Sequence, residues 1–249
     1  MKWMSPWWML LAGLWSLNVV GMPLPQQLIV AFSEAPPWKI ISPQQEFTGV
    51  DMEILQQLAS KHGLSLVIKP APLARCLEML KSGDADLVSN LMRTADRETF
   101  IRYLDVPYQT RTDKVFYLQA DNPRQIQSYE ELYGLSIGVK RGAKYGSRFD
   151  GDSRLYKESA VSGLMNLKKL AAGRLDAVIS TESEGDYLIK SRHWQHKFKK
   201  AALRFDEPRD VYFGLSRRSK LLSLAGSFEV DLRQLVQSGQ LEQIKARYQ

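Results

Sequence analysis

The sequence predicts an α/β fold made of two similar lobes, each with a mostly parallel sheet flanked by helices. Strand-like and helix-like segments alternate along the chain, which is the order that parallel sheets require. A pattern of five residues also recurs with identical spacing, and this internal repeat predicts two similar halves. The two copies are Leu77, Leu80, Gly83, Asp86 and Val88, and Leu167, Leu170, Gly173, Asp176 and Val178.

The first half of the chain predicts a strand, a helix and a strand, in that order. Residues 28–32 are rich in β-forming side chains, residues 51–62 carry apolar side chains at helical spacing, and residues 64–69 alternate like a strand. A second helix follows Pro72 and ends at Gly83, because glycine suits the left-handed conformation common at a helix C-terminus. A short apolar strand follows this helix and ends over residues 86–88.

The second half repeats this order. We expect a strand at residues 135–139, a turn at Gly142, a helix over residues 160–172 and a strand at residues 176–179. Between the halves, residues 107–123 include a polar run that is suited to crossing from one lobe to the other. No low-complexity linker separates the halves, so we expect lobes that hinge about a cleft, where ligands commonly bind.

Residues 1–21 are typical of a secretory signal peptide, which predicts a periplasmic mature chain. Lys2 precedes a short apolar core, and Val19 and Gly21 can occupy the positions before a cleavage point. The apolar run is short for a membrane span, which needs about 20 apolar residues. An uncleaved anchor is the alternative, because glycine is a less typical cleavage residue than alanine.

The composition argues against several classes of protein. The chain has 249 residues, a formal net charge of +7 and one cysteine, Cys76, which excludes an intrachain disulfide. The basic clusters lack interleaved aromatic side chains, so we expect no nucleic-acid partner. His193 and His196 lack a third ligand nearby, and no P-loop, nucleophile elbow or dinucleotide-binding glycine motif occurs, so we expect no metal, cofactor or catalytic residue.

One segment, at the start of a predicted short helix, suits an anion. Thr94 can cap this helix, and Arg93 and Arg97 flank its free backbone NH groups. A ligand carboxylate would meet guanidinium groups and the positive end of a helix there. The alternative interpretation is a surface arginine paired with Asp96 or Asp105, since surface ion pairs are common and weak.

Seven stretches of the mature chain, in a fixed order, carry a family resemblance. They are AFSEAPPW at 31–38, FTGVDMEILQQLASKHGL at 47–64, LKSGDADLV at 80–88, RTADRE at 93–98, DVPY at 105–108, LSIGVKRGAKYG at 135–146 and LAAGRLDAVIS at 170–180. Together they resemble the family 3 extracellular solute-binding proteins, periplasmic components that deliver amino acids and other small polar ligands to transporters. The resemblance implies the type II periplasmic binding protein fold, in which two crossover strands join two lobes that close on a ligand. It further implies a first lobe of residues 22–110 and 206–249 and a second lobe of residues 111–205.

The resemblance also implies ligand contacts in the first lobe. Arg97 would grip a ligand carboxylate, with the hydroxyl of Thr94 beside it. Glu34 and Trp38 follow the first strand and would line the pocket, although Trp38 can instead shield the core of the lobe. Arg75, at another helix start, either faces the cleft and suits an acidic or doubly charged ligand, or is an exposed helix residue.

In the second lobe the resemblance is less complete. The backbone NH groups of Gly142 and Ala143, at a helix start, would take another ligand oxygen. Amino-acid binders of this family place an aspartate for the ligand ammonium where Thr181 stands, with Glu182 next to it as a possible substitute. An α-amino acid is therefore only one candidate ligand.

A second departure lies just before Arg97. The loop there is one residue shorter than in typical amino-acid binders, and Asn90 and Arg93 stand among the residues that replace small hydroxyl side chains. We therefore include Asn90 and Arg93 among the candidate ligand contacts.

The function that these observations predict is capture of a small carboxylate-bearing ligand, an amino acid or a related polar acid, by a monomeric periplasmic protein. An ABC transporter permease or a sensor is the expected partner. The resemblance leaves two alternatives open, a secreted dehydratase-like enzyme of the same fold and a ligand-sensing protein for a signalling partner.

Overall fold

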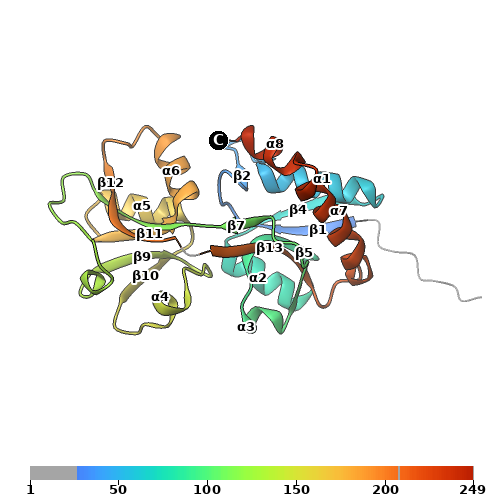
Figure 1. Ribbon diagram of the computed structural model, residues 1–249, viewed down its shortest axis with the longest axis horizontal. Coiled ribbons are helices and arrows are strands. Elements are labelled where there is room, and N and C mark those ends of the chain that lie inside the picture. The colour runs from blue at the N-terminus through green and yellow to red at the C-terminus, as the bar shows by residue number, and fades with distance from the viewer. Residues whose placement is uncertain (1–26, 207, 249) are drawn as a thin grey trace, which may run out of the picture.

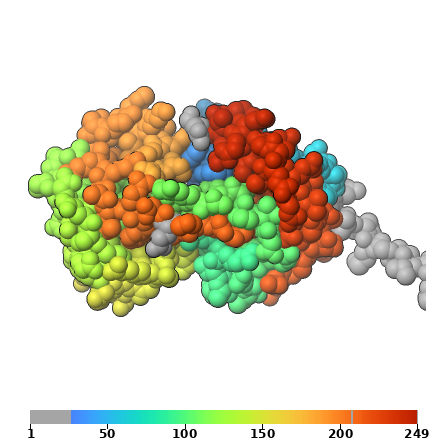
Figure 2. Space-filling view, viewed as in Figure 1, coloured from blue at the N-terminus to red at the C-terminus, as the bar shows by residue number. Residues whose placement is uncertain are grey.

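A computed structural model describes residues 27–206 and 208–248, which form two lobes joined side by side (Figure 1). Figure 2 shows the lobes as two distinct masses, with the C-terminal segment lying over the first lobe. The expected signal peptide, residues 1–21, lies outside the described residues. Within the described part of the chain, every helix is too short or too polar to cross a bilayer.

The first lobe is built on a mixed sheet with the strand order β4-β1-β5-β13-β6, to which β7 is added through β13. Its strands are β1 (Gln27–Phe32), β4 (Ser65–Pro70), β5 (Leu87–Met92), β6 (Ile101–Tyr103), β7 (Gln109–Arg111) and β13 (Pro208–Ser216). β1 pairs in parallel with β4 and β5, whereas β13 runs antiparallel to its neighbours. A small hairpin of β2 (Ile40–Ile41) and β3 (Phe47–Thr48) follows β1.

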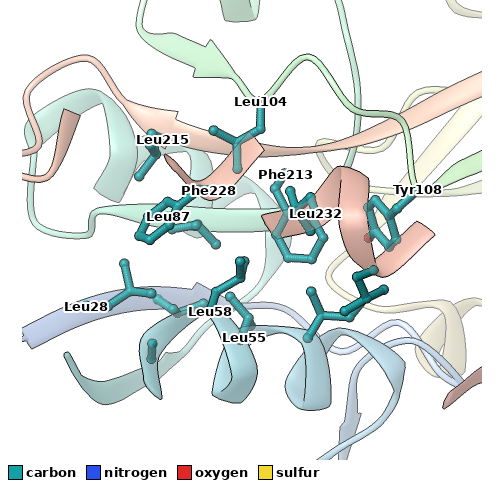
Figure 3. Packing of buried hydrophobic residues seen from close by; sticks show 14 of the residues in the cluster. Leu28, Leu55, Leu58, Leu87, Leu104, Tyr108, Phe213, Leu215, Phe228 and Leu232 are labelled. Carbon is teal, nitrogen blue, oxygen red and sulfur yellow. The ribbon is translucent and has the colours of Figure 1, made fainter. Parts of the chain in front are cut away.

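Helices cover both faces of this sheet, because alternate side chains of its strands are apolar and buried on each side. These helices are α1 (Val50–Lys61), α2 (Leu73–Ser82), α3 (Ala95–Glu98), α7 (Ala225–Gln237), which follows the short 3-10 turn η2 (Leu222–Leu224), and α8 (Gln240–Ala246). Helices α1, α7 and α8 share one core with β1, β5 and β13, and α2 packs in the core on the other face. Figure 3 shows Leu55 and Leu58 of α1 facing Phe228 and Leu232 of α7 across this core.

The second lobe has a five-stranded sheet with the order β10-β9-β11-β8-β12. Its elements are β8 (Lys114–Gln119), η1 (Glu130–Leu132), β9 (Ser136–Lys140), α4 (Ser147–Gly151), β10 (Tyr156–Ala160), α5 (Gly163–Ala171), β11 (Ala177–Thr181), α6 (Glu182–Lys190) and β12 (Phe198–Phe205). β9 pairs in parallel with β10 and β11, and β8 is antiparallel to β11 and β12. Helices α5 and α6 pack on one face and α4 on the other.

Two segments cross between the lobes. β7 leads into β8, and β12 is followed by β13, which returns the chain to the first sheet. The crossing segments pair with each other, since Val211 of β13 lies opposite Gln109 of β7. The architecture is the expected two-lobed α/β fold, whereas the lobe boundaries expected after residues 110 and 205 stay a prediction.

The internal repeat corresponds to one hydrogen-bond arrangement that occurs in both lobes. In the first lobe, a carboxylate oxygen of Asp86 accepts from the backbone NH of Ile29 at 2.9 Å. In the second lobe, Asp176 accepts from the backbone NH of Ser136 at 2.8 Å. Each aspartate also donates its own NH to the carbonyl of the same partner, so it ties the strand that follows a helix to its parallel neighbour, β1 in the first lobe and β9 in the second.

Two predicted boundaries were wrong. The helix expected over residues 160–172 begins only at Gly163, because Ala160 pairs with Lys140 as the end of β10 and the Ser162 hydroxyl caps the helix by accepting from the NH of Met165. The strand expected to end near Val88 continues to Met92, because it is enclosed by neighbours on both sides and pairs with β13 along that length.

Candidate ligand-binding cleft

A cleft lies between the lobes at the ends of their parallel strands. Residues of both lobes line it, and polar side chains are frequent among them. They are Ser33, Ala35, Pro36, Trp38, Lys39, Leu73, Asn90, Leu91, Met92, Arg97, Gln109, Thr112, Lys114, Lys140, Ala143, Lys144, Thr181, Ser183, Glu184 and Val211. Five of the twenty are cations and one is an acid, so the wall of the cleft is strongly basic.

Arg97 lies in this cleft and is only 4% exposed. Its position is set by Thr94, which caps α3 as predicted by accepting from the NH of Arg97 at 3.4 Å. The guanidinium donates to the carbonyl of Met92 at 2.9 Å and, across the cleft, to the carbonyl of Gly142 at 2.7 Å. Burial lowers the pKa of Arg97, partly offset by Tyr103, but an arginine stays charged at any physiological pH.

Asn90 also lines the cleft, and a bulge in β5 places it there. β5 has two residues between the pairs Val88–Gly214 and Leu91–Tyr212, whereas β13 has one. The extra residue is Asn90, which adopts a left-handed backbone with φ of 62°, a conformation that asparagine tolerates better than most side chains. Bulges of this kind re-aim a side chain next to a functional site.

Trp38 combines the two roles that the sequence left open. It lines the cleft, and its ring also packs edge-on against Tyr108 of the lobe core, with the centroids 5.6 Å apart. Glu34, in contrast, is half-buried and contributes its backbone carbonyl, which accepts from Lys140 of the other lobe at 2.5 Å. Burial raises the pKa of the Glu34 carboxyl, and the nearby charge of Lys140 opposes that shift.

A buried charged network lies under the wall of the first lobe. Lys39 is 1% exposed and donates to the hydroxyl of Ser33 at 3.2 Å and to the carbonyl of Ser89 at 3.0 Å. The hydroxyl of Ser89 donates in turn to Asp51, which is fully buried, at 2.7 Å. Burial lowers the pKa of Lys39 and raises that of Asp51 to about 6, and the opposite charge of the partner limits both shifts.

In the second lobe, Lys140 ends β9 and reaches across the cleft. Besides the carbonyl of Glu34, it donates to the carboxylate of Glu184 at 2.9 Å, and both side chains of this ion pair are largely buried. Together with the bond from Arg97 to Gly142, the bond from Lys140 to Glu34 joins the two lobes directly. The structure is therefore a closed arrangement of the lobes around the cleft.

The segment that crosses from β7 to β8 forms one side of the cleft, which we call its floor. Gln109, Thr112 and Lys114 all line it and are at most 8% exposed. Lys114 donates to the hydroxyl of Thr181 at 2.6 Å, and none of the ion pairs in the described chain involves it. The side-chain nitrogen of Gln109 and the hydroxyl of Thr112 are buried without a hydrogen-bond partner. Burial lowers the pKa of Lys114 to about 8.

A smaller cavity adjoins the cleft inside the second lobe. It shares Lys140, Thr181 and Glu184 with the cleft and extends to Asn166 of α5. The side chain of Asn166 is 1% exposed, and neither its amide nitrogen nor its oxygen has a hydrogen-bond partner.

The expectation for Gly142 and Ala143 was wrong in its geometry. The helix after this turn, α4, begins at Ser147, and the NH of Ala143 is already used by the carbonyl of Lys140 at 3.0 Å. Gly142 contributes its carbonyl, which accepts from Arg97. Glycine is needed there, because φ is 81° and a Cβ atom would come within 3.2 Å of the backbone of Ala74 in the other lobe.

The other predicted contacts fall into two groups. Thr181 lines the cleft, where its hydroxyl accepts from Lys114. Arg93, Arg75 and Glu182 are not among the residues that line it. Arg93 is bonded to Asp105 on the outer surface, Arg75 is exposed on α2, and Glu182 pairs with Lys200 and Arg204.

Sequence reasoning missed most of the basic wall. Lys39, Lys114, Lys140 and Lys144 were not identified, and neither was their acidic neighbour Glu184. A usable signal existed for two of the lysines, since Lys114 and Lys140 each stand at one end of an apolar strand, where side chains reach the edge of a sheet. Lys39 carried no such signal, because its buried position depends in part on Ser89, which is 50 residues away in the chain.

The described chain offers no cluster of three or more histidine, cysteine or acidic side chains placed to hold a metal ion. The cations and hydroxyl groups that line the cleft suit the recognition of oxygen anions.

Comparison with known proteins assigns a family to this architecture. Residues 28–249 match the family described as bacterial extracellular solute-binding proteins, family 3. A probable histidine-binding protein of Campylobacter jejuni is 27% identical over 117 residues, which cover 46% of this chain and 45% of that protein. The chain thus spans about half the length of this curated relative.

Solved structures share the fold. The amino acid ABC transporter substrate-binding protein AbpA of Streptococcus pneumoniae, bound to L-arginine, superposes with a TM-score of 0.78 at 21% identity, over 90% of this chain and 94% of that one. A histidine kinase sensor domain with similarity to periplasmic binding proteins has a TM-score of 0.77 at 19% identity, over 90% of this chain and 96% of that one.

Proposed function

This chain belongs to the family 3 bacterial extracellular solute-binding proteins, and we propose that it captures a small carboxylate-bearing ligand between its lobes in the periplasm. The ligand is an amino acid or a related polar acid. The loaded protein delivers it to an ABC transporter permease. Binding without chemistry is the proposed role, since proteins with this family's architecture work by closing on a solute.

The observation that carries this proposal is the position of Arg97. Its guanidinium is buried in the cleft and has no carboxylate partner among the ion pairs of the described residues. It donates one hydrogen bond to each of two backbone carbonyls, those of Met92 and Gly142. A guanidinium has five NH donors, so it retains donors for a bidentate bond to a carboxylate. Such a bond in a desolvated cleft is strong, because few water molecules compete for it.

Closure couples binding to delivery. Arg97 and Lys140 bond directly to the opposite lobe, so the closed arrangement has contacts of its own, and a ligand that touches both lobes adds to them. The ligand shifts the population toward the closed form only as far as it binds that form more tightly than the open form.

Sensing is a second candidate function. A histidine kinase sensor domain of the same fold covers 90% of this chain, as large a share as the transport protein covers, so a signalling partner is the alternative to a permease. In this role the closed form would be recognised by a signalling partner. The two roles share the ligand and differ in the partner, which an affinity capture from membranes with the loaded protein as bait would distinguish.

The anchor role of Arg97 is tested by titration calorimetry. A thermal-shift screen of the purified protein against amino acids and small organic acids first identifies a ligand, because a ligand selective for the folded state raises the melting temperature. Arg97→Ala is then expected to weaken its binding by about 2–5 kcal/mol. Arg102→Ala is the matched control, since Arg102 belongs to the same lobe but pairs with Glu229 away from the cleft. Equal affinity of the Arg97 variant and wild type would refute the anchor assignment.

A further inference from the structure

We propose that the ligand carries two anionic groups, with the second one, a carboxylate or a phosphate, bound on the floor of the cleft by Lys114, Thr112 and Gln109. This inference rests on the proposed function, because it takes the first carboxylate to lie on Arg97. It goes further in naming the ligand as a small dianionic acid.

The first argument is the excess of positive charge. The wall contains Lys39, Arg97, Lys114, Lys140 and Lys144 against the single carboxylate of Glu184. Lys140 is compensated by its ion pair with Glu184, and Lys39 is linked through Ser89 to the buried carboxylate of Asp51. Arg97 and Lys114 are both buried and take part in none of the ion pairs of the described chain. A monoanionic ligand would compensate only one of them.

The second argument is the floor itself. A buried ammonium group is unfavourable unless it is paired and hydrogen-bonded, yet Lys114 has one neutral hydroxyl, that of Thr181, for its three donors. The hydroxyl of Thr112 and the amide nitrogen of Gln109 line the same cleft and are also buried without partners. An oxyanion bound by these three side chains would supply the acceptors that they lack.

Carboxylates do surround Lys114 at longer range. Glu184, Asp113 and Asp150 favour its charged form, whereas Arg209 opposes it. These acids are engaged elsewhere, since Glu184 binds Lys140, Asp113 binds Arg111 and Arg204, and Asp150 accepts from the NH of Tyr145. None of them replaces a direct partner for the ammonium group.

The wall also lacks a free acid for a ligand ammonium group. Its one carboxylate, Glu184, is bonded to Lys140, and the last residue of β11 is the uncharged Thr181, whose hydroxyl is bonded to Lys114. The ligand therefore needs no amino group, and a simple dicarboxylate satisfies the site.

The test compares matched probes by titration calorimetry with the full chain. Glutarate and 2-phosphoglycolate carry two anionic groups, butyrate carries one, and glutamate adds an ammonium group to glutarate. We expect at least one of the two dianions to bind about 30-fold or more tighter than butyrate, as loss of a desolvated charge partner predicts. We expect glutamate to bind no more than about tenfold tighter than glutarate. The tighter binder of the two identifies the second group, as a carboxylate if it is glutarate and as a phosphate if it is 2-phosphoglycolate.

Lys114→Met then assigns the second group to the floor. This variant should lose about 30-fold or more in affinity for the dianion and change the affinity for butyrate by less than about threefold. Lys114→Gln serves as a second variant that keeps a hydrogen-bond donor, and circular dichroism checks that both fold. Lys169→Met is the matched control, because Lys169 pairs with Glu158 outside the cleft.

The outcomes separate this inference from the proposed function. Equal binding of butyrate and the dianions, or equal losses for both classes in Lys114→Met, would overturn the second anionic subsite and leave carboxylate capture intact. Much tighter binding of glutamate than glutarate would overturn the claim that no amino group is needed. If none of these probes binds and the amino acids and organic acids of the thermal-shift screen also fail, the proposed function fails together with this inference.

Discussion

The two lobes bury a lysine at the cleft in different ways. In the first lobe, Lys39 donates to the Ser33 hydroxyl and to the carbonyl of Ser89, whose hydroxyl donates to the buried Asp51, and the charge of Asp51 favours the protonated lysine. In the second lobe, Lys114 is almost equally buried but has only the hydroxyl of Thr181. The lobes otherwise repeat the same helix, glycine and aspartate arrangement. The difference predicts that Lys39 supports the fold, whereas Lys114 is kept for the proposed ligand.

The largest expected effect comes from breaking the compensated pair. Asp51→Ala leaves Lys39 buried without its counter-charge, so the free energy of unfolding should fall by about 3–5 kcal/mol. Urea denaturation followed by circular dichroism measures this loss. Glu130→Ala is a suitable control, since Glu130 pairs with Arg148 and both side chains are largely exposed, so its loss should change stability by about 1 kcal/mol or less. A loss of similar size in both variants would contradict the structural role of the Lys39 network.

The repeated aspartates should matter less, and about equally. Asp86→Ala and Asp176→Ala each leave a backbone NH of the neighbouring strand without its acceptor. Each should lower the free energy of unfolding by about 1–3 kcal/mol, the typical penalty for an unsatisfied buried polar group. Chemical denaturation of the two variants side by side tests whether the repeat is equivalent in energy as well as in geometry. An effect in one lobe alone would show that the likeness is geometric only.

Removing the uncompensated lysine should have the opposite sign. Lys114→Met exchanges an unpaired buried charge for an apolar side chain of similar length, so the free protein should gain about 1 kcal/mol in stability. Differential scanning calorimetry without ligand measures this gain. Combined with weaker dianion binding, it would mark Lys114 as a residue kept for function. A loss of 2 kcal/mol or more, on the order of other core defects, would instead mean that Lys114 supports the fold.

The gain from Lys114→Met should shrink at alkaline pH. The pKa of Lys114 is about 8 in the folded chain and 10.5 in an ordinary environment, so below pH 8 both states are protonated and the penalty of burying the charge is fully present. Between about pH 8 and 10 the folded chain releases this proton while the unfolded chain keeps it, which stabilises wild type relative to the variant. Urea denaturation of both proteins at pH 7 and pH 9.5 measures the change. A gap that widens with pH would contradict the burial of an uncompensated ammonium group.

The smallest effect is expected for replacement of Arg93. This variant distinguishes the role that the sequence predicts for Arg93 from the position that the structure gives it. Arg93 is a candidate ligand contact by sequence, yet in the structure it is bonded to Asp105 outside the cleft. Arg93→Ala should therefore change ligand affinity by less than about 0.5 kcal/mol. Titration calorimetry beside Arg97→Ala checks this. A loss comparable to that of Arg97→Ala would mean that both arginines reach the ligand.

Local signals predicted the fold well. The alternation of strands and helices, the glycine caps at Gly83 and Gly173, and the aspartates that follow them are short-range features, and the structure has them where the sequence indicates. Boundaries were less accurate where a neighbouring strand extended an element. β5 reaches Met92 because β13, more than 110 residues away, pairs with it.

The candidate site was predictable only in part. Thr94 and Arg97 lie within three residues of each other on one helical turn, so their relation could be read from the sequence. The bulge at Asn90 could not be read, because it depends on the register of two distant strands. The roles of Gly142 and Ala143 were misjudged because the helix begins four residues after Ala143 and the NH of Ala143 is used within the turn.

By itself, the sequence determined a two-lobed α/β protein of a solute-binding family with an arginine suited to a carboxylate. The tertiary structure alone decided that Arg97, Lys114 and Lys140 share one cleft. The physical reason is that charge compensation is a matter of distance in space. Lys140 is neutralised by Glu184, which is 44 residues away in the chain and 2.9 Å away in the fold, whereas Lys114 lies beside Asp113 in sequence and still lacks an ion pair.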